Sequence, residues 1–145
     1  MREATPADAP LILGMAKAHY LENVPKQFVF NDQIAGNYIE ACLKIGAIGY
    51  VSDDGFIFGE VMDTWFGENR MVHGPLCYIK PESRNGFTAR RFLRAFISAA
   101  KDKAKYVYTD SYNLGHGRAL NGLLRIEGFD EIGKIYLKEF KVCQP

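Results

Sequence analysis

The sequence has few of the residues that build metal centres and disulfide frameworks, since its 145 residues include only three cysteines and three histidines. Cys42, Cys77 and Cys143 form no CxxC pair, and their number is odd. A structural zinc site and a disulfide scaffold are therefore not expected, and neither is any other metal site. Cys42 lies on an apolar helical stripe and Cys77 in a strand, so both are expected to be small buried side chains in a reducing compartment.

A strong net charge and a long apolar run are also missing. The net charge is +1, so the chain is not adapted to hold nucleic acid through its overall field, although a local basic patch stays open. No run reaches the roughly 18 apolar residues of a membrane-spanning helix. The start MREATPADAP lacks the basic and then apolar pattern of a signal peptide. We therefore expect a cytoplasmic protein that does not enter the membrane.

The apolar content of 48% and the aromatic content of 13% are enough for a sizeable core, and the length fits one domain over residues 1–145. Spacing and capping residues predict four helices: after Thr5, after Asn31, after Gly86 and over about 117–126. Strands are predicted over 47–51, 56–65, 71–79 (interrupted at Gly74-Pro75), 106–109 as a short buried strand, and as a pair within 129–141. This order predicts an α+β fold with one strand–helix–strand unit and a parallel strand pair.

The junction YIKPESRNGFTARRFL, residues 78–93, combines a strand end, a glycine and several arginines at the start of a helix. The first N–H groups of a helix have no partner inside it and carry partial positive charge. A glycine lets a ligand approach the backbone, and nearby arginines add charge-assisted hydrogen bonds. The junction is therefore a candidate phosphate site. It is neither GxxxxGK[ST] nor GxGxxG.

The segment Arg84-Asn85-Gly86-Phe87-Thr88-Ala89 resembles the acyl-CoA loop of the GNAT superfamily of N-acetyltransferases, where a strand is followed by Q/R-x-x-G-x-G/A and a long amphipathic helix. Arg84 and Ala89 fit this frame. Phe87 stands where the family usually has glycine, and Gly86 comes one position early. MREATPADAP and GFDEIG are similar to two other family segments, so the resemblance covers nearly the whole chain. It implies one GNAT-like domain: a mixed, mostly antiparallel sheet of six to seven strands, about four flanking helices and a splayed parallel strand pair.

The resemblance also implies an activity, the transfer of an acetyl group from acetyl-CoA to a primary amine that attacks the thioester directly. The donor would be held by the strand end, by the loop and by one residue beyond the following strand. Those residues are Cys77, Tyr78, Ile79, Arg84, Asn85, Gly86, Phe87, Thr88, Ala89, Arg90 and Asn113.

His73, eleven positions before the loop, stands where histone-modifying relatives place a glutamate base. A histidine, with a reference pKa of about 6.5, suits base work near neutral pH. Glu60, on the neighbouring strand, is the rival base. Leu124 occupies the position of the family's tyrosine acid, so Tyr112 or Tyr108 are candidates to replace it.

Several alternatives stay open at this stage. The amine can belong to a small molecule, a protein or a modified nucleobase, and the frame resembles divergent family members that include those of bacteriophages. Phe87 and Leu124 favour a second reading, a non-catalytic binding or phage-assembly module with the same fold. Action on nucleic acid has weaker support, and pairing of two chains through the aromatic segment 56–66 is a further option.

Overall fold

The computed structural model describes the whole chain except residues 25–27, 65–66, 110–116 and 133–145. The helices among the described residues are η1 (Pro6–Asp8), α1 (Ala9–Asn23), α2 (Asp32–Lys44), η2 (Pro81–Ser83), α3 (Gly86–Lys101) and α4 (Gly117–Ile126). The strands are β1 (Arg2–Glu3), β2 (Ile48–Ser52), β3 (Gly55–Asp63), β4 (Arg70–Ile79) and β5 (Tyr106–Tyr108).

Within the described residues the strands form one sheet in the order β1-β2-β3-β4-β5. Neighbours from β1 to β4 are antiparallel, and β4 and β5 are parallel and joined through α3. The predicted α+β class and the predicted parallel pair are therefore confirmed. Most of segment 129–141, where two more strands are predicted, lies outside the described residues. The expectation that β5 is buried is wrong, because Tyr106 is 50% exposed.

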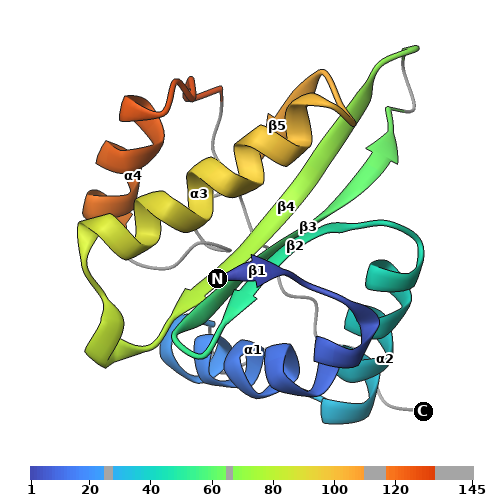
Figure 1. Ribbon diagram of the computed structural model, residues 1–145, viewed down its shortest axis with the longest axis vertical. Coiled ribbons are helices and arrows are strands. Elements are labelled where there is room, and N and C mark those ends of the chain that lie inside the picture. The colour runs from blue at the N-terminus through green and yellow to red at the C-terminus, as the bar shows by residue number, and fades with distance from the viewer. Residues whose placement is uncertain (25–27, 65–66, 110–116, 133–145) are drawn as a thin grey trace, which may run out of the picture.

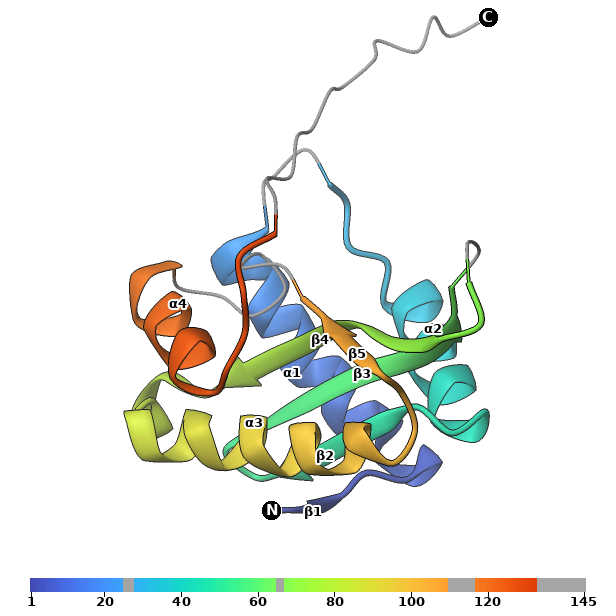
Figure 2. The ribbon, with the colours of Figure 1, turned by 90° about the horizontal axis from the view of Figure 1, so that it is seen from above.

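Helices cover both faces of the sheet, and each face has its own core (Figures 1 and 2). On the face of α1 and α2, the buried residues include Ile12, Met15, Ile39, Phe56, Phe58 and Tyr78. On the face of α3, they include Ile57, Val72, Phe92, Leu93 and Phe96, and Leu124 of α4 packs against this cluster. Consecutive β3 residues thus point to opposite cores, as strand geometry requires.

A bulge interrupts β4 where Gly74-Pro75 predicts one. Phe58 pairs with Leu76 but Glu60 pairs with His73, so β4 uses one more residue than β3 across this step. Gly74 has φ 57°, a left-handed conformation that glycine adopts without strain. The extra residue reverses the alternation of β4. His73 consequently faces α1 and α2 together with Leu76, although the two residues are an odd number of positions apart.

Gly59, opposite the bulge, is required by close packing. A Cβ atom at this position would lie 2.8 Å from Cζ of Phe96 and 3.1 Å from Cγ1 of Val72. Because Phe96 and Val72 are fully buried, neither side chain can move aside freely. The ring of Phe96 therefore packs directly on the β3 backbone.

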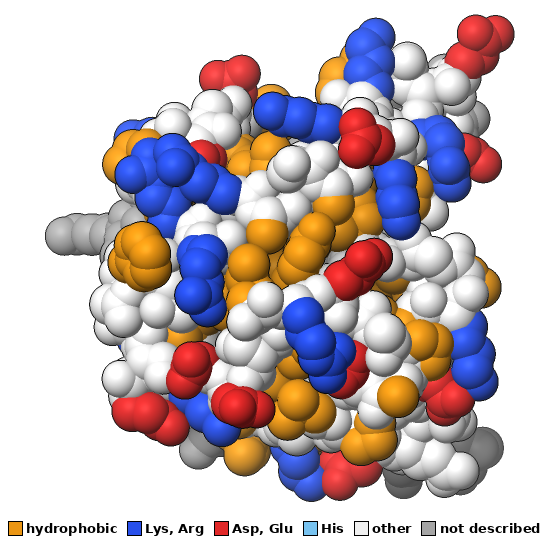
Figure 3. Space-filling model, in the orientation of Figure 1, with side chains coloured by type: hydrophobic (Ala, Val, Ile, Leu, Met, Phe, Trp, Pro, Cys, Tyr) orange, Lys and Arg blue, Asp and Glu red, His pale blue; other side chains and the backbone are white. Residues whose placement is uncertain are grey.

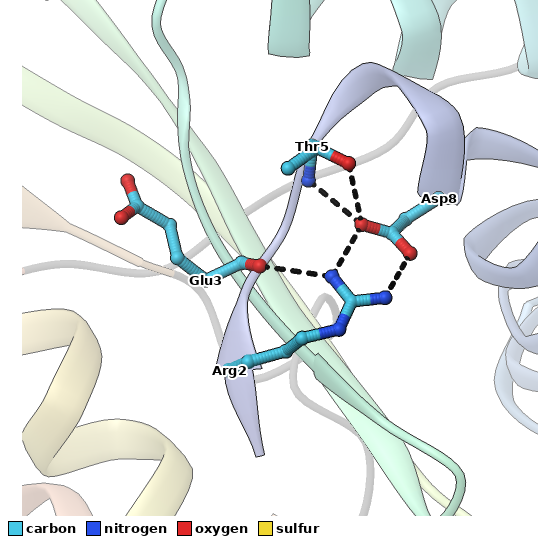
Figure 4. A network of polar contacts seen from close by, with 4 residues as sticks. All are labelled: Arg2, Glu3, Thr5 and Asp8. Carbon is cyan, nitrogen blue, oxygen red and sulfur yellow. Dashed lines mark hydrogen bonds and ion pairs between the residues drawn. The ribbon is translucent and has the colours of Figure 1, made fainter.

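A polar network fixes the start of the first helix (Figure 4). The Asp8 carboxylate accepts hydrogen bonds from the N–H of Thr5 at 2.8 Å and from its hydroxyl at 2.9 Å. The Arg2 guanidinium donates to both Asp8 oxygens, at 2.7 and 2.5 Å. These bonds hold the pKa of Asp8 well below its usual range, with the hydrogen bond from Arg2 the largest cause. They also tie β1 to the segment that leads into α1.

Several sequence expectations differ from the structure in detail. The helix predicted after Thr5 is a separate 3-10 turn followed by α1 from Ala9, and β3 ends at Asp63. Leu11 and Ile34, apolar residues of the helices predicted after Thr5 and after Asn31, are 41% and 69% exposed. Among the described helices, none has the length and apolar character needed to cross a membrane.

Candidate functional site

The start of α3 presents backbone N–H groups to its surroundings. Asn85 caps the helix, since its side-chain oxygen accepts the Thr88 N–H at 2.8 Å. The N–H groups of Gly86 and Phe87 have no acceptor among the described residues. A Cβ atom at Gly86 would meet no described atom within 4 Å, and Phe87 is 76% exposed. The space in front of these amides can therefore accept an anionic group.

The arginines of the predicted loop are held by carboxylates. The Arg84 guanidinium donates to the Ile79 carbonyl at 2.8 Å and pairs with Glu22 at the end of α1. Tyr78 donates its hydroxyl to the same Glu22 at 2.9 Å. Arg84 thus links the loop to α1, and the idea that its side chain holds phosphate stays a prediction.

Arg90 is also paired. It donates to Glu127 at 2.6 Å, and Arg94 donates to the same carboxylate at 3.0 Å, which lowers the pKa of Glu127. This contact joins α3 to the residue that follows α4. In Figure 3, Lys and Arg side chains gather at the upper left, where Figure 1 places α4 and the first half of α3.

The parallel strands β4 and β5 pair over a short distance. Met71, Val72 and His73 pair with Tyr106, Val107 and Tyr108, and no described residue of β5 pairs with β4 beyond His73. The end of β4, Cys77 to Ile79, therefore pairs with β3 along one edge. Along its other edge, no described strand pairs with it. The Cys77 side chain packs in the core on the α3 face, and burial raises the pKa of its thiol to about 12. Among the described residues, the pairing of β4 with β5 thus ends at the bulge.

A row of polar side chains crosses the sheet at His73, where the described pairing of β4 with β5 ends. Glu60 is the register partner of His73 across β3 and β4, and His73 is the register partner of Tyr108 across β4 and β5. Directly paired residues point to the same face and have Cβ atoms about 5 Å apart. The rings of His73 and Tyr108 stack with centroids 5.5 Å apart and planes 4° apart. The structure therefore brings together the two bases that the sequence offers as rivals.

Two α2 side chains hold Glu60. The Cys42 thiol donates to Oε1 of Glu60 at 2.8 Å, and the Tyr38 hydroxyl interacts with the same carboxylate. Burial, followed by Glu60, raises the pKa of Cys42 to about 11, and the same causes raise that of Tyr38 above its usual range. Both side chains are thus neutral donors at physiological pH, and they fix the position of the Glu60 carboxylate.

Sequence reasoning did not find these two partners. Cys42 is buried as predicted, but it also bonds a carboxylate 18 positions away on another element. No local signal in the chain indicates such a contact.

A cavity of 310 Å³ opens beside Glu60 and His73, between α1, α2 and the two long strands. Its other lining residues include His19 and Tyr20 of α1, Tyr38 of α2, and Phe58 of β3. Phe30, in the segment between α1 and α2, also lines it. Its neighbour Phe28 is 43% exposed and is not among the lining residues.

The remaining predicted residues fall into two groups. Tyr112 and Asn113 lie outside the described residues, so their roles stay predictions. Leu124 packs in the core on the α3 face, and Tyr108 stacks on His73. Among the described tyrosines, Tyr108 thus contacts His73 and Tyr38 contacts Glu60.

Comparison with solved structures identifies the fold. A predicted acetyltransferase from Clostridium acetobutylicum, solved with acetyl-CoA, matches with a TM-score of 0.75 and 14% identity, over 95% of this chain and 94% of that chain. A ribosomal-protein-alanine N-acetyltransferase from Brucella melitensis matches with a TM-score of 0.69 and 20% identity, over 91% and 85%. An aminoglycoside acetyltransferase from an uncultured soil metagenomic sample, in complex with sisomicin, matches with a TM-score of 0.65 and 8% identity, over 97% and 94%.

No protein-family model and no curated protein matches the sequence. At the identities of the solved structures, the likeness establishes the fold and no more. The chain has the fold of the GNAT superfamily of N-acetyltransferases, as the resemblance of its loop implies.

Proposed function

We propose that this protein is an acetyl-CoA-dependent N-acetyltransferase that transfers the acetyl group directly to a primary amine. One observation carries the proposal: the described pairing of β4 with β5 ends at His73, beside Glu60, on a strand that leads into a helix with unpartnered N–H groups. The edge of β4 after His73 would bind the pantetheine arm of acetyl-CoA, and His73 and Glu60 would then lie beside the thioester. The solved relative with acetyl-CoA supports this choice of donor.

The residues of the chain suit a thioester donor with a diphosphate. The amides of Gly86 and Phe87 would take the diphosphate, because a helix start favours negative charge. The backbone of β4 from Cys77 to Ile79 would pair with the pantetheine amides as an added strand does. Arg84, held by Glu22, would fix the loop, while its backbone stays beside the helix start.

His73 is the better base of the two candidates. Glu60 already accepts a hydrogen bond from the Cys42 thiol and interacts with the Tyr38 hydroxyl, so its carboxylate is engaged by the protein. His73 is exposed and is not engaged by these donors. We assign recognition of the incoming ammonium to Glu60 and removal of its proton to His73.

The chemical step then balances without a further reactant. The ammonium proton passes to His73, and the amine nitrogen forms a bond to the thioester carbonyl carbon. The carbon–sulfur bond breaks, the sulfur leaves with its electron pair, and the bonded nitrogen gives up its second proton. One ammonium and one thioester thus become one amide, one thiol and one proton, and that last proton leaves His73 for water. We assign the proton that the sulfur takes up to Tyr108, which stacks on His73, and the second proton of the nitrogen replaces it.

A second candidate is a non-catalytic module that binds acetyl-CoA. The packing of Leu124 into the core, at the position where the family has a tyrosine acid, favours it. Binding without turnover would distinguish this candidate from the enzyme.

Titration calorimetry with acetyl-CoA tests the donor site, and Gly86→Asp is the informative variant. A carboxylate at the first helical position stabilises the helix but repels a diphosphate, so affinity is expected to fall about tenfold at a separation of ~6 Å. Gly86→Asn, which has the same size without the charge, is the matched control and should bind much as the wild type does. Absence of binding at millimolar acetyl-CoA, or equal loss in both variants, would reject the donor site.

Release of free CoA in the presence of amines tests the base. His73→Ala should lower kcat/KM by about 100-fold or more, because the proton acceptor is removed. Acetyl-CoA binding that is intact with no CoA release from the wild type would favour the non-catalytic module.

A further inference from the structure

The cavity beside Glu60 differs from a polar substrate cleft in its walls. Beyond Glu60, His73 and His19, it is bounded mainly by aromatic rings and aliphatic side chains, among them Ala16 and Ile39. Tyr20 and Phe30 pack with centroids 5.1 Å apart, and Tyr38 stands edge-on to Phe58 at 6.4 Å. Phe58 and Ile39 are each only 3% exposed, so the floor of the cavity is the protein core itself.

The cavity carries a single carboxylate among its described lining residues, and that carboxylate is Glu60. Its partners Cys42 and Tyr38 are neutral donors, so they hold the negative charge in place without cancelling it. The remaining ionisable groups that line the cavity are the two tyrosines, Tyr20 and Tyr38, and the imidazoles of His19 and His73. The single carboxylate of this mostly apolar cavity therefore suits a ligand with one ammonium group on an apolar body.

We propose that the acceptor is a primary monoamine whose amine is carried on an apolar, ring-containing body, with the ammonium at Glu60 and the ring among Tyr20, Phe30 and Phe58. This inference rests on the proposed function, because it names the acceptor of that same site. The cavity of 310 Å³ lies at the small end of the range for ligand pockets, which suits one ring and a short chain. A polyamine would leave further charges unpaired against apolar walls, where they are costly.

Acceptor selection is tested with acetyl-CoA and three amines: 2-phenylethylamine, ethanolamine and sisomicin. Burying a phenyl ring gives a preference of about 10- to 100-fold in kcat/KM for 2-phenylethylamine over ethanolamine. Binding of 2-phenylethylamine is measured separately by calorimetry with CoA present. A better rate with sisomicin or ethanolamine would overturn the inference while leaving the transferase intact.

Two variants locate the amine. Glu60→Gln should weaken binding of 2-phenylethylamine by about tenfold or more, because an uncharged amide replaces the partner of the ammonium. Ala35→Leu adds volume to the lining of the cavity and should also weaken the binding of 2-phenylethylamine. Ala41→Leu, at an exposed position of the same helix, should leave this binding unchanged. Equal effects of the two alanine variants would overturn the inference.

The two proposals fail in different ways. If acetyl-CoA does not bind, the proposed function is wrong, and amine binding that still depends on Glu60 and Ala35 would support the assigned ligand class. If acetyl-CoA binds and is turned over with other amines but 2-phenylethylamine neither binds nor reacts, only the acceptor assignment is wrong.

Discussion

Replacing Asp8 by asparagine is expected to destabilise the start of the first helix and to change how folding depends on pH. Asp8 is 7% exposed, and its carboxylate accepts the Thr5 N–H, the Thr5 hydroxyl and both Arg2 nitrogens. Asparagine keeps one acceptor oxygen but turns an NH₂ group toward these donors. At least one of them loses its partner, and the charge that assists the Arg2 bonds disappears.

The magnitude follows from the type of bond that is lost. A hydrogen bond to a charged group contributes about 1.5–3 kcal/mol. The Arg2 side chain is 62% exposed and can turn to water, so the lower part of this range applies. We expect a loss of about 2 kcal/mol, which lowers Tm by about 4–8 °C for a domain of this size.

The sign of the pH effect follows from the depressed pKa of Asp8. The stabilisation is fully present above the unfolded value of about 3.9, and is lost as the pH falls from there toward the lower folded pKa. The difference in stability between wild type and Asp8→Asn should therefore be largest near pH 7 and should shrink below pH 4.

Urea denaturation at several pH values between 3 and 7 measures this difference. Asp63→Asn is the matched control, because Asp63 also pairs with an arginine but its side chain is 86% exposed. It should change stability by less than about 1 kcal/mol at every pH. A difference for Asp8→Asn that is equally small, or that grows toward acid pH, would refute the reasoning.

Three further predictions concern other parts of the fold. Gly59→Ala forces a Cβ atom to 2.8 Å from the Phe96 ring and should cost about 1–3 kcal/mol, seen as a lower urea midpoint; an unchanged midpoint would contradict the close packing. Cys42, with its pKa raised to about 11, should react with iodoacetamide at pH 8 at least about tenfold more slowly than a free thiol, measured by mass spectrometry at this site; rapid labelling would contradict its burial. Glu22→Gln weakens the pairing with Arg84, so Tm should fall by about 2–4 °C in thermal denaturation, and a stability equal to the wild type would mean that the pair contributes nothing.

The bulge explains why the candidate site could be predicted only in part. Simple alternation along β4 places His73 on the opposite face from Leu76, because three positions separate them. The additional residue at Gly74 brings both to the face of α1 and α2, beside Glu60. The residues at the bulge are visible in the sequence, but the direction in which it turns the neighbouring side chains depends on the register with β3.

The sequence by itself determined the local elements, because capping and turn signals act within a few residues. Asn31 and Asn85 cap the helices that were predicted to follow them, and α4 covers the expected residues 117–126. The loop motif likewise identified the fold. Only the tertiary structure decided that Cys42 and Tyr38 hold Glu60 and that Arg84 turns toward Glu22. Such contacts join residues far apart in the chain, and they arise from sheet register and helix packing, which no short stretch of sequence contains.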